Sequence, residues 1–182
     1  DIALSNIAQD ELGHARLWYG LLEAMGYDET DLIWEREPAT FRHATVAELP
    51  VEEGDWADAV VRSYLYDVAE DVRLAALADS SLPAIRNRVG KVRDEEDYHL
   101  DHAHNWLERL AGAADGAERL QAAVDRLVPH ALTLFSPSGD YETLDGAAAV
   151  EDVDAAIDDL GLRDRTLAEE REEWFTRVAG TL

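Results

Sequence analysis

Two short segments of the sequence combine a carboxylate and an imidazole at the same spacing. Glu11 is followed three residues later by His14, and Glu96 is followed at the same interval by His99. Residues three apart on an α-helix are neighbours on one face, so each pair can direct both side chains to one point. Carboxylate and imidazole ligands together suit iron or manganese. The spacing therefore predicts a metal site if both pairs lie on helices that face each other.

Both pairs interrupt the apolar stripe of a predicted helix. The first pair lies on a helix predicted over residues 2–25, with the stripe Leu4, Ile7, Trp18, Leu21 and Met25. The second lies on a helix predicted over residues 84–111, with the stripe Val89, Val92, Ala103, Trp106 and Leu110. Both charged pairs are therefore expected to face the core. A buried carboxylate must be paired or bind a metal, because its desolvation otherwise costs too much.

A metal site is one of three interpretations of these pairs. A single Glu-x-x-His pair in an acidic helix usually belongs to a solvated face, since Glu and His are exposed by default. Two copies that both interrupt an apolar stripe favour the metal site. The remaining alternative is a metal-free core, in which the same groups pair with arginine or with one another.

A helix predicted over residues 56–79 is apolar almost all round. Asp55 is a suitable N-cap for it. Only the arc through Asp58, Arg62 and Arg73 is expected to face solvent. A helix that is apolar on most sides is central to a bundle or covered by a partner.

Three acids, Asp67, Glu70 and Asp71, are set into this apolar helix. Metal ligation explains them, and pairing with an arginine of the same helix explains them equally well. Glu70 is the first candidate ligand because its longer side chain reaches the axis of a bundle, and Asp67 is the second. A short turn at residues 80–83 makes the flanking helices antiparallel, which brings Glu70 and Glu96 to a similar height.

The rest of the chain predicts an all-α fold without strands. Residues 27–54 lack a sustained period, so we expect a long crossover loop that lets the helices on either side run parallel. The remaining expected elements are helices over 116–135, 151–160 and 163–179 and a loop over 136–150. No linker divides the sequence, and residues 1–182 are predicted to form a single domain.

The charge of the chain limits its partners. Forty acidic residues face sixteen basic ones, which gives a net charge of −24, and Lys91 is the single lysine. Such a surface repels nucleic acid and anionic membranes, and no apolar run is long enough to span a bilayer. Because the acids are spread along every predicted helix, we interpret them as an adaptation to high salt.

The sequence lacks cysteine, so any metal must be held by carboxylates and imidazoles. It also shows no signal-peptide pattern at its start, and we expect a cytoplasmic protein.

The sequence resembles a known family in several separated places. These are the run Asp1–Arg16, Phe41–Arg42, Glu48–Pro50, Asp55–Asp58, Tyr64 with Asp67, Tyr98–Leu100 and Trp106–Leu110. They are similar to the C subunits of phenylacetyl-CoA epoxidases, also called phenylacetate-CoA oxygenases. The resemblance covers nearly the whole chain.

This resemblance implies a ferritin-like helical bundle. Di-iron sites in such bundles take a carboxylate from each of two helices and a Glu-x-x-His pair from each of the other two. In the family, the di-iron centre that epoxidises the ring of phenylacetyl-CoA with O₂ lies in the A subunit, and the C subunit is its structural partner. C subunits commonly lack a complete metal site, whereas both Glu-x-x-His pairs are intact here.

Two function classes follow. In the first, the chain is an accessory subunit of a hetero-oligomer, whose apolar helix over 56–79 and long loop bind the catalytic A-type subunit, and which meets phenylacetyl-CoA through the complex. In the second, it is a di-iron oxidase or a ferritin-like iron protein in its own right. The candidate ligands are Glu11, His14, Glu70, Glu96 and His99. The sequence begins inside a helix, so we expect the family's first helix, with the remaining carboxylate, to lie outside it.

Overall fold

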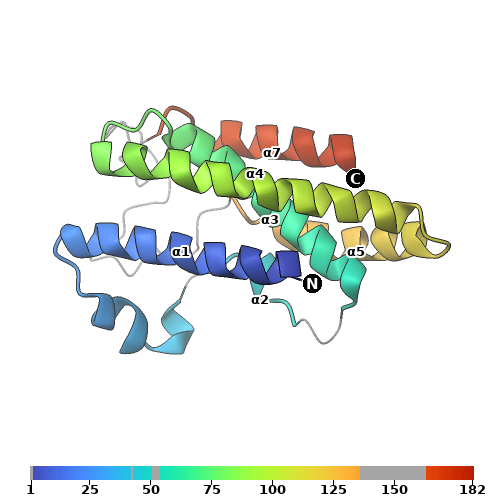
Figure 1. The fold of residues 1–182 in the computed structure, drawn as a ribbon, viewed down its shortest axis with the longest axis horizontal. Coiled ribbons are helices and arrows are strands. Elements are labelled where there is room, and N and C mark those ends of the chain that lie inside the picture. The colour runs from blue at the N-terminus through green and yellow to red at the C-terminus, as the bar shows by residue number, and fades with distance from the viewer. Residues whose placement is uncertain (1, 42, 51–53, 136–162) are drawn as a thin grey trace.

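The computed structural model describes residues 2–41, 43–50, 54–135 and 163–182 (Figure 1). Within these ranges every regular element is helical, as predicted. The long helices are α1 (Ile2–Ala24), α3 (Trp56–Leu77), α4 (Pro83–Ala111), α5 (Gly116–Ala131) and α7 (Leu167–Thr181). The predicted loop over 136–150 and helix over 151–160 lie outside the described residues.

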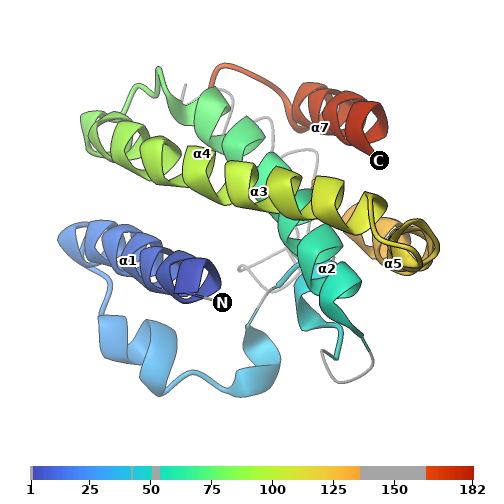
Figure 2. The ribbon, with the colours of Figure 1, turned by 45° about the vertical axis from the view of Figure 1, so that its right-hand side comes forward.

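Helices α3 and α4 form the centre of the bundle. They are joined by a short turn and run antiparallel, as predicted, and α3 also packs against α5 and α7. Figure 2 shows α1 and α7 on opposite sides of this central pair. The predicted N-cap of α3 is confirmed, because the carboxylate of Asp55 accepts hydrogen bonds from the N–H groups of Ala57 and Asp58. The carboxylate of Asp58 in turn accepts from the N–H of Asp55 at 2.7 Å, which completes a capping box.

The crossover between α1 and α3 is less irregular than predicted. It contains the π-helical turn η1 (Thr30–Trp34), the 3-10 turn η2 (Pro38–Thr40) and the one-turn helix α2 (Thr45–Glu48). Before it, α1 ends at Ala24, and the φ of 100° at Gly26 suits the left-handed position that follows a helix. Since α1 and α3 are both antiparallel to α4, they run in the same general direction (Figure 1), which is what the crossover predicted.

The main hydrophobic core lies where α3 meets α4, α5 and α7. Its largest fully buried side chains include Tyr64, Leu65, Leu127 and Trp174. The indole N–H of Trp174 donates to the carbonyl oxygen of Leu65 at 2.9 Å, so α7 is fixed to one position along α3. A second, much smaller cluster joins the ends of α1, α3 and α4. It consists of Leu74, Val89 and Val92, with Leu17, Trp18, Leu77, Ala78 and Ile85 packed against it.

The predicted solvent-facing arc of α3 is wrong. Asp58 is buried and forms an ion pair with Arg126 of α5. Arg62 is half-buried and donates to the carbonyl oxygen of Leu49 at 3.0 Å, and Arg73 is half-buried as well. These residues look like a polar face in the sequence because their partners lie in other elements.

Helix α1 is much less buried than its apolar stripe predicted. Of its residues, only His14 and Leu21 are buried. Leu4, near the start of α1, is 38% exposed, and Met25, directly after its last residue, is 60% exposed. Both ends of the predicted stripe therefore face outward. The physical reason is that α1 packs mainly against α4, so the described part of the chain leaves its other faces largely uncovered.

Two predicted helix boundaries shift by four residues. The helix predicted over 116–135 ends at Ala131, and the helix predicted over 163–179 begins at Leu167. The later start follows from a capping box, in which Thr166 is the N-cap and Glu169 returns the hydrogen bond.

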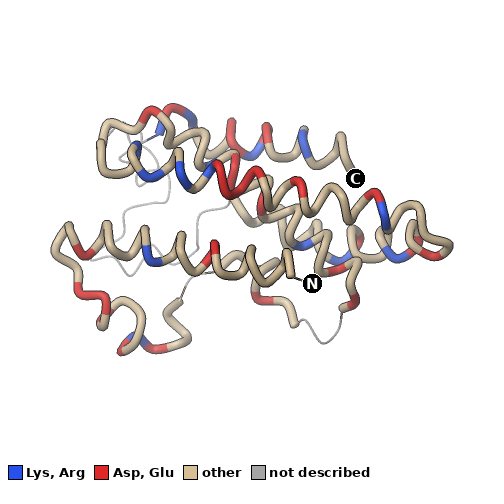
Figure 3. The backbone as a smooth tube through the Cα atoms, in the orientation of Figure 1, with Lys and Arg blue, Asp and Glu red and all other residues tan. Residues whose placement is uncertain are grey.

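Acidic residues are spread along the helices and the crossover (Figure 3). Within the described residues they do not gather into one segment, in agreement with the pattern of the sequence. None of the described helices is both long enough and apolar enough to cross a bilayer.

Candidate metal centre

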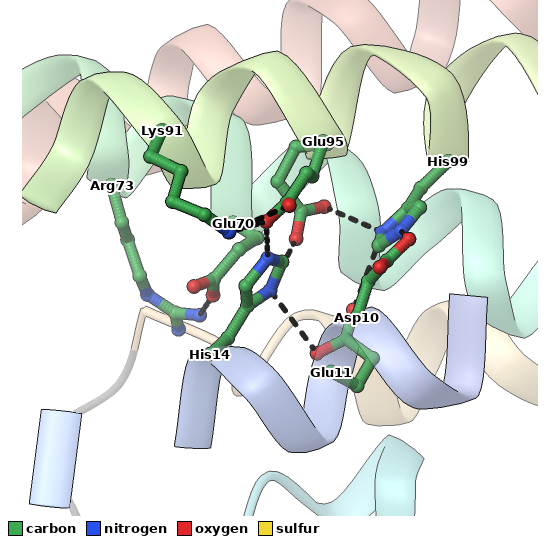
Figure 4. Close-up of polar contacts among 9 residues, drawn as sticks. Asp10, Glu11, His14, Glu70, Arg73, Lys91, Glu95 and His99 are labelled. Carbon is green, nitrogen blue, oxygen red and sulfur yellow. Dashed lines mark hydrogen bonds and ion pairs between the residues drawn. The ribbon is translucent and has the colours of Figure 1, made fainter. Parts of the chain in front are cut away.

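The two Glu-x-x-His pairs meet between α1 and α4 (Figure 4). Nδ1 of His14 lies 3.3 Å from Oε1 of Glu96, and Nδ1 of His99 lies 3.4 Å from Oε2 of the same carboxylate. Glu11 faces the same two nitrogens, with its oxygens 3.9 Å from Nδ1 of His14 and 3.3 Å from Nδ1 of His99. Each carboxylate therefore directs one oxygen to each imidazole.

The four residues differ in burial. The side chains of His14, Glu96 and His99 are at most 6% exposed, as the inward-facing stripes predicted. The side chain of Glu11 is 45% exposed, so its predicted burial is wrong. Glu11 lies on the poorly covered side of α1, and the centre is consequently closed by α4 and more open along α1.

Four atoms at this centre are buried without a hydrogen-bond partner in the described part of the chain. They are Nδ1 of His14, Nδ1 of His99 and both carboxylate oxygens of Glu96. A buried polar atom left unpaired costs about 1–3 kcal/mol, so such atoms are rare in folded proteins. A cation bound between the two pairs would satisfy all four. The ligand atoms offered by Glu11, His14 and Glu96 already lie within 4.8 Å of one another, so these residues fit a metal ion.

The clustered carboxylates at the centre change the pKa of His99. Burial alone would lower the pKa of His99, but the carboxylates of Glu11 and Glu96 raise the pKa to about 10. Without a metal, the proton on His99 therefore offsets part of the negative charge at neutral pH. Metal binding to His99 would have to release that proton.

Helix α3 contributes Asp67 and Glu70 to the surroundings of the centre. Asp67 is buried, and burial together with the nearby charge of Glu96 raises the pKa of Asp67 well above its ordinary value. Burial also raises the pKa of Glu70. The guanidinium of Arg73 lies 3.9 Å from Oε2 of Glu70 (Figure 4) and offsets part of this rise. The role of Glu70 as a ligand, and of Asp67 as its substitute, stays a prediction.

Asp71, the third acid of α3, is held by arginines. It forms ion pairs with Arg93 of α4 at 3.2 Å and with Arg177 of α7 at 2.8 Å. Asp71 is therefore paired with arginine, which was one of the two predicted explanations for the acids of α3. The prediction placed the arginines on the same helix, whereas both come from other helices.

Comparison with known proteins identifies the family. A family model described as phenylacetic acid catabolic protein matches residues 1–170. The chain belongs to the phenylacetic acid catabolic protein family.

Two relatives from this family come from Escherichia coli strain K12. The chain is 32% identical to the C subunit of 1,2-phenylacetyl-CoA epoxidase over 166 residues, which cover 90% of this chain and 64% of that relative. It is 27% identical to the A subunit of the same enzyme over 133 residues, which cover 72% of this chain and 42% of that second relative. The chain thus spans less than two thirds of the length of either relative.

The phenylacetic acid catabolic protein family is ferritin-like, and the helical bundle agrees with that fold. The relatives include both a C-type and an A-type subunit.

Two acids of the chain contact the outer ring nitrogens and were not predicted from the sequence. Nε2 of His14 is 2.9 Å from Oε2 of Glu95, and Nε2 of His99 is 3.5 Å from Oδ2 of Asp10. The contacts are crossed, because each acid faces the histidine of the other helix. An acceptor at Nε2 favours the tautomer that leaves Nδ1 free to bind a metal. The signal was present in the sequence, since an acid directly precedes the Glu of each pair.

Proposed function

We propose that this chain is an accessory, structural subunit of a multicomponent phenylacetyl-CoA ring 1,2-epoxidase that acts in aerobic phenylacetate catabolism. The observation that carries the proposal is the similarity to the C subunit, which is higher in identity and covers more of the chain than the similarity to the A subunit. The partner in this proposal is an A-type ferritin-like subunit, which brings the site for phenylacetyl-CoA into a cytoplasmic hetero-oligomer.

The uncovered side of α1 supports a role as a subunit. Several large apolar side chains on α1 and the crossover are exposed. They are Ile2, Leu12, Met25, Tyr27 and Trp34. The sequence suggested the apolar helix over 56–79 and the long loop as the partner-binding surface. Helix α3 is largely covered by α4, α5 and α7, whereas the crossover exposes apolar side chains. A partner that covers α1 and the crossover would remove this apolar surface from water.

A second candidate function is a di-iron protein in its own right, and the buried atoms of His14, Glu96 and His99 that lack a hydrogen-bond partner favour it. Iron would be held by these three residues and Glu11, with Glu70 as the candidate from α3. A bound di-iron centre supplies the activation of O₂. The protein's own residues direct Nδ1 of both imidazoles inward, and α4 excludes water from one side of the centre.

The decisive experiment combines partner binding with metal analysis. The full-length protein is co-expressed with the A-type subunit of the same genome, and the purified complex is assayed for iron and for epoxidation of phenylacetyl-CoA. The accessory role predicts a stable complex and no epoxidation by the isolated chain. Failure to bind the A-type partner contradicts the accessory role, and turnover by the isolated chain with O₂ and a reductant establishes the second candidate.

Glu96→Ala separates the two functions further. In a metal-free accessory subunit, this change removes the ion-pair partner that His14 and His99 share, so it is expected to lower stability while the iron content stays at zero. In a di-iron protein, it removes a ligand that faces both imidazoles and should abolish tight iron binding. Asp97→Ala is the matched control, because Asp97 is the next residue on α4 and is exposed.

A further inference from the structure

The two imidazoles of the centre differ in the distance from Nε2 to their outer carboxylate. Nε2 of His14 lies 2.9 Å from its outer carboxylate on Glu95, a normal length for an N–H···O hydrogen bond. Nε2 of His99 lies 3.5 Å from its outer carboxylate on Asp10, which is beyond the usual range. Outer carboxylates fix the tautomer and the orientation of a metal-binding histidine. His14 is therefore better oriented for a metal than His99.

Lys91 adds to the difference in orientation between His14 and His99. Its Nζ lies 2.6 and 2.9 Å from the two oxygens of Glu95, one helical turn along α4 (Figure 4). Lys91 is the only lysine in the sequence. Within the described residues, no lysine or arginine forms an ion pair with Asp10. An exposed ion pair adds little to stability, but this one holds the Glu95 carboxylate in contact with His14.

The inner ligands point to the same half of the centre. The donor atoms that already lie within 4.8 Å of one another belong to Glu11, His14 and Glu96, and His99 is not among them. Glu70 lies on the His14 side of the centre in Figure 4, and its charge interacts with that imidazole. The His14 half thus combines a compact set of donors with a fixed imidazole.

We infer that the two halves of the centre bind divalent cations in order, first at Glu11, His14 and Glu96, and second beside His99. Glu95 and Lys91 are positioning residues for the first cation, and they act through His14. Ligands that are already held in place lose less conformational freedom on binding, which favours the first position. This inference rests on the proposed metal binding.

The test is a titration of the full-length wild-type protein with Mn²⁺, followed by the electron paramagnetic resonance signal of free Mn²⁺ and by calorimetry. We expect two steps, with the first equivalent bound at least about tenfold more tightly than the second. Glu95→Gln should weaken the first step by about 10- to 100-fold, the usual effect of losing an outer partner. Asp10→Asn should act on the second step, and Lys91→Met should weaken the first step by less than Glu95→Gln.

Asp97→Asn is the control for the loss of one negative charge, because Asp97 is exposed on α4 and is not among the partners of either imidazole. Two equal steps overturn the inference and leave metal binding itself intact. So does a Glu95→Gln variant that binds as tightly as Asp97→Asn. If the wild-type protein binds no Mn²⁺, both the inference and the proposed metal site are wrong. Because Glu95 is partly exposed, its variant is expected to fold, and the thermal midpoint checks this.

Discussion

The α7 side and the α1 side of the central helix pair differ in how they are packed. On the α7 side, large residues such as Trp174 and Leu65 are fully buried in one continuous core. On the other side, α1 buries only His14 and Leu21 of its own residues. The stability of the fold is therefore concentrated on one side, while the candidate metal centre lies on the other.

The ligands of the candidate metal centre also come from one well-packed helix and one poorly packed helix. Glu96 and His99 come from α4, which is packed on both sides, whereas Glu11 comes from the exposed side of α1. Segments with few buried apolar contacts open locally at a lower free energy than the core. We expect α1 to be able to separate from α4 without unfolding the rest of the bundle, and a bound cation or a partner subunit to suppress that opening.

The largest expected effect tests the packed side. Trp174→Ala removes a fully buried indole and its hydrogen bond to Leu65, and should lower the free energy of unfolding by about 3–5 kcal/mol. Trp18→Ala should cost clearly less, because Trp18 is only partly buried where α1 packs against the small cluster. Chemical denaturation followed by circular dichroism measures both. Equal losses would show that the two sides contribute equally.

A bound cation should reduce the difference in packing stability between the two sides by stabilising the contact between α1 and α4. If Mn²⁺ binds between α1 and α4, a free concentration 100 times its Kd should stabilise the protein by about 2.7 kcal/mol. Hydrogen exchange should slow most at the amides of α1 around Glu11 and His14, because their local opening breaks the centre. Slowing that is confined to α5 and α7 would place the bound cation elsewhere.

Salt should act on both sides, since acids are spread along the described helices on both sides of the central pair (Figure 3). Raising KCl from 0.1 M to 3 M shortens the Debye length below about 3 Å and relieves the repulsion within a net charge of −24. For a chain of this size, each kcal/mol gained raises the thermal midpoint by about 2–4 °C. A midpoint that is flat or falls across this range contradicts the interpretation as an adaptation to high salt.

The smallest expected effect concerns a cap on the packed side. Hydrogen bonding from Arg119 keeps the pKa of Asp55 below its ordinary value of 3.8. A lowered pKa gives stability that is present above about pH 4 and lost as the pH falls through the folded-state pKa. Asp55→Asn keeps a good N-cap and removes the charge, so it should cost less than about 1 kcal/mol at pH 7. The free energies of unfolding of the two proteins should converge once the pH falls below the folded-state pKa of Asp55, and a difference that persists at the acid end would show that the charge is not its cause.

Local patterns were enough to predict the helices and the pairing of the two motifs. The 3.6-residue periodicity located α1, α3 and α4, and the short turn after α3 made α3 and α4 antiparallel. Asp55 marked the start of α3 through its own capping chemistry. Each of these depends on residues that are close together in the sequence.

The errors arose where a residue's partner is distant in the sequence. Asp58 looked solvent-facing because Arg126 lies 68 positions further along the chain. Leu4 and Met25 looked buried because periodicity shows which face of a helix is apolar and does not show what covers it. The contact between Glu95 and His14 was missed for the same reason, although an acid before each motif was visible.

The separation of these partners along the chain also has a consequence for folding kinetics. His14 and Glu95 are 81 residues apart, and Asp10 and His99 are 89 residues apart, whereas α3 and α4 are joined by one short turn. Closing the longer loops costs more chain entropy, so we expect the α3–α4 hairpin to form first and α1 to dock late. Substitutions of Glu11 should therefore change the unfolding rate and leave the folding rate nearly unaltered.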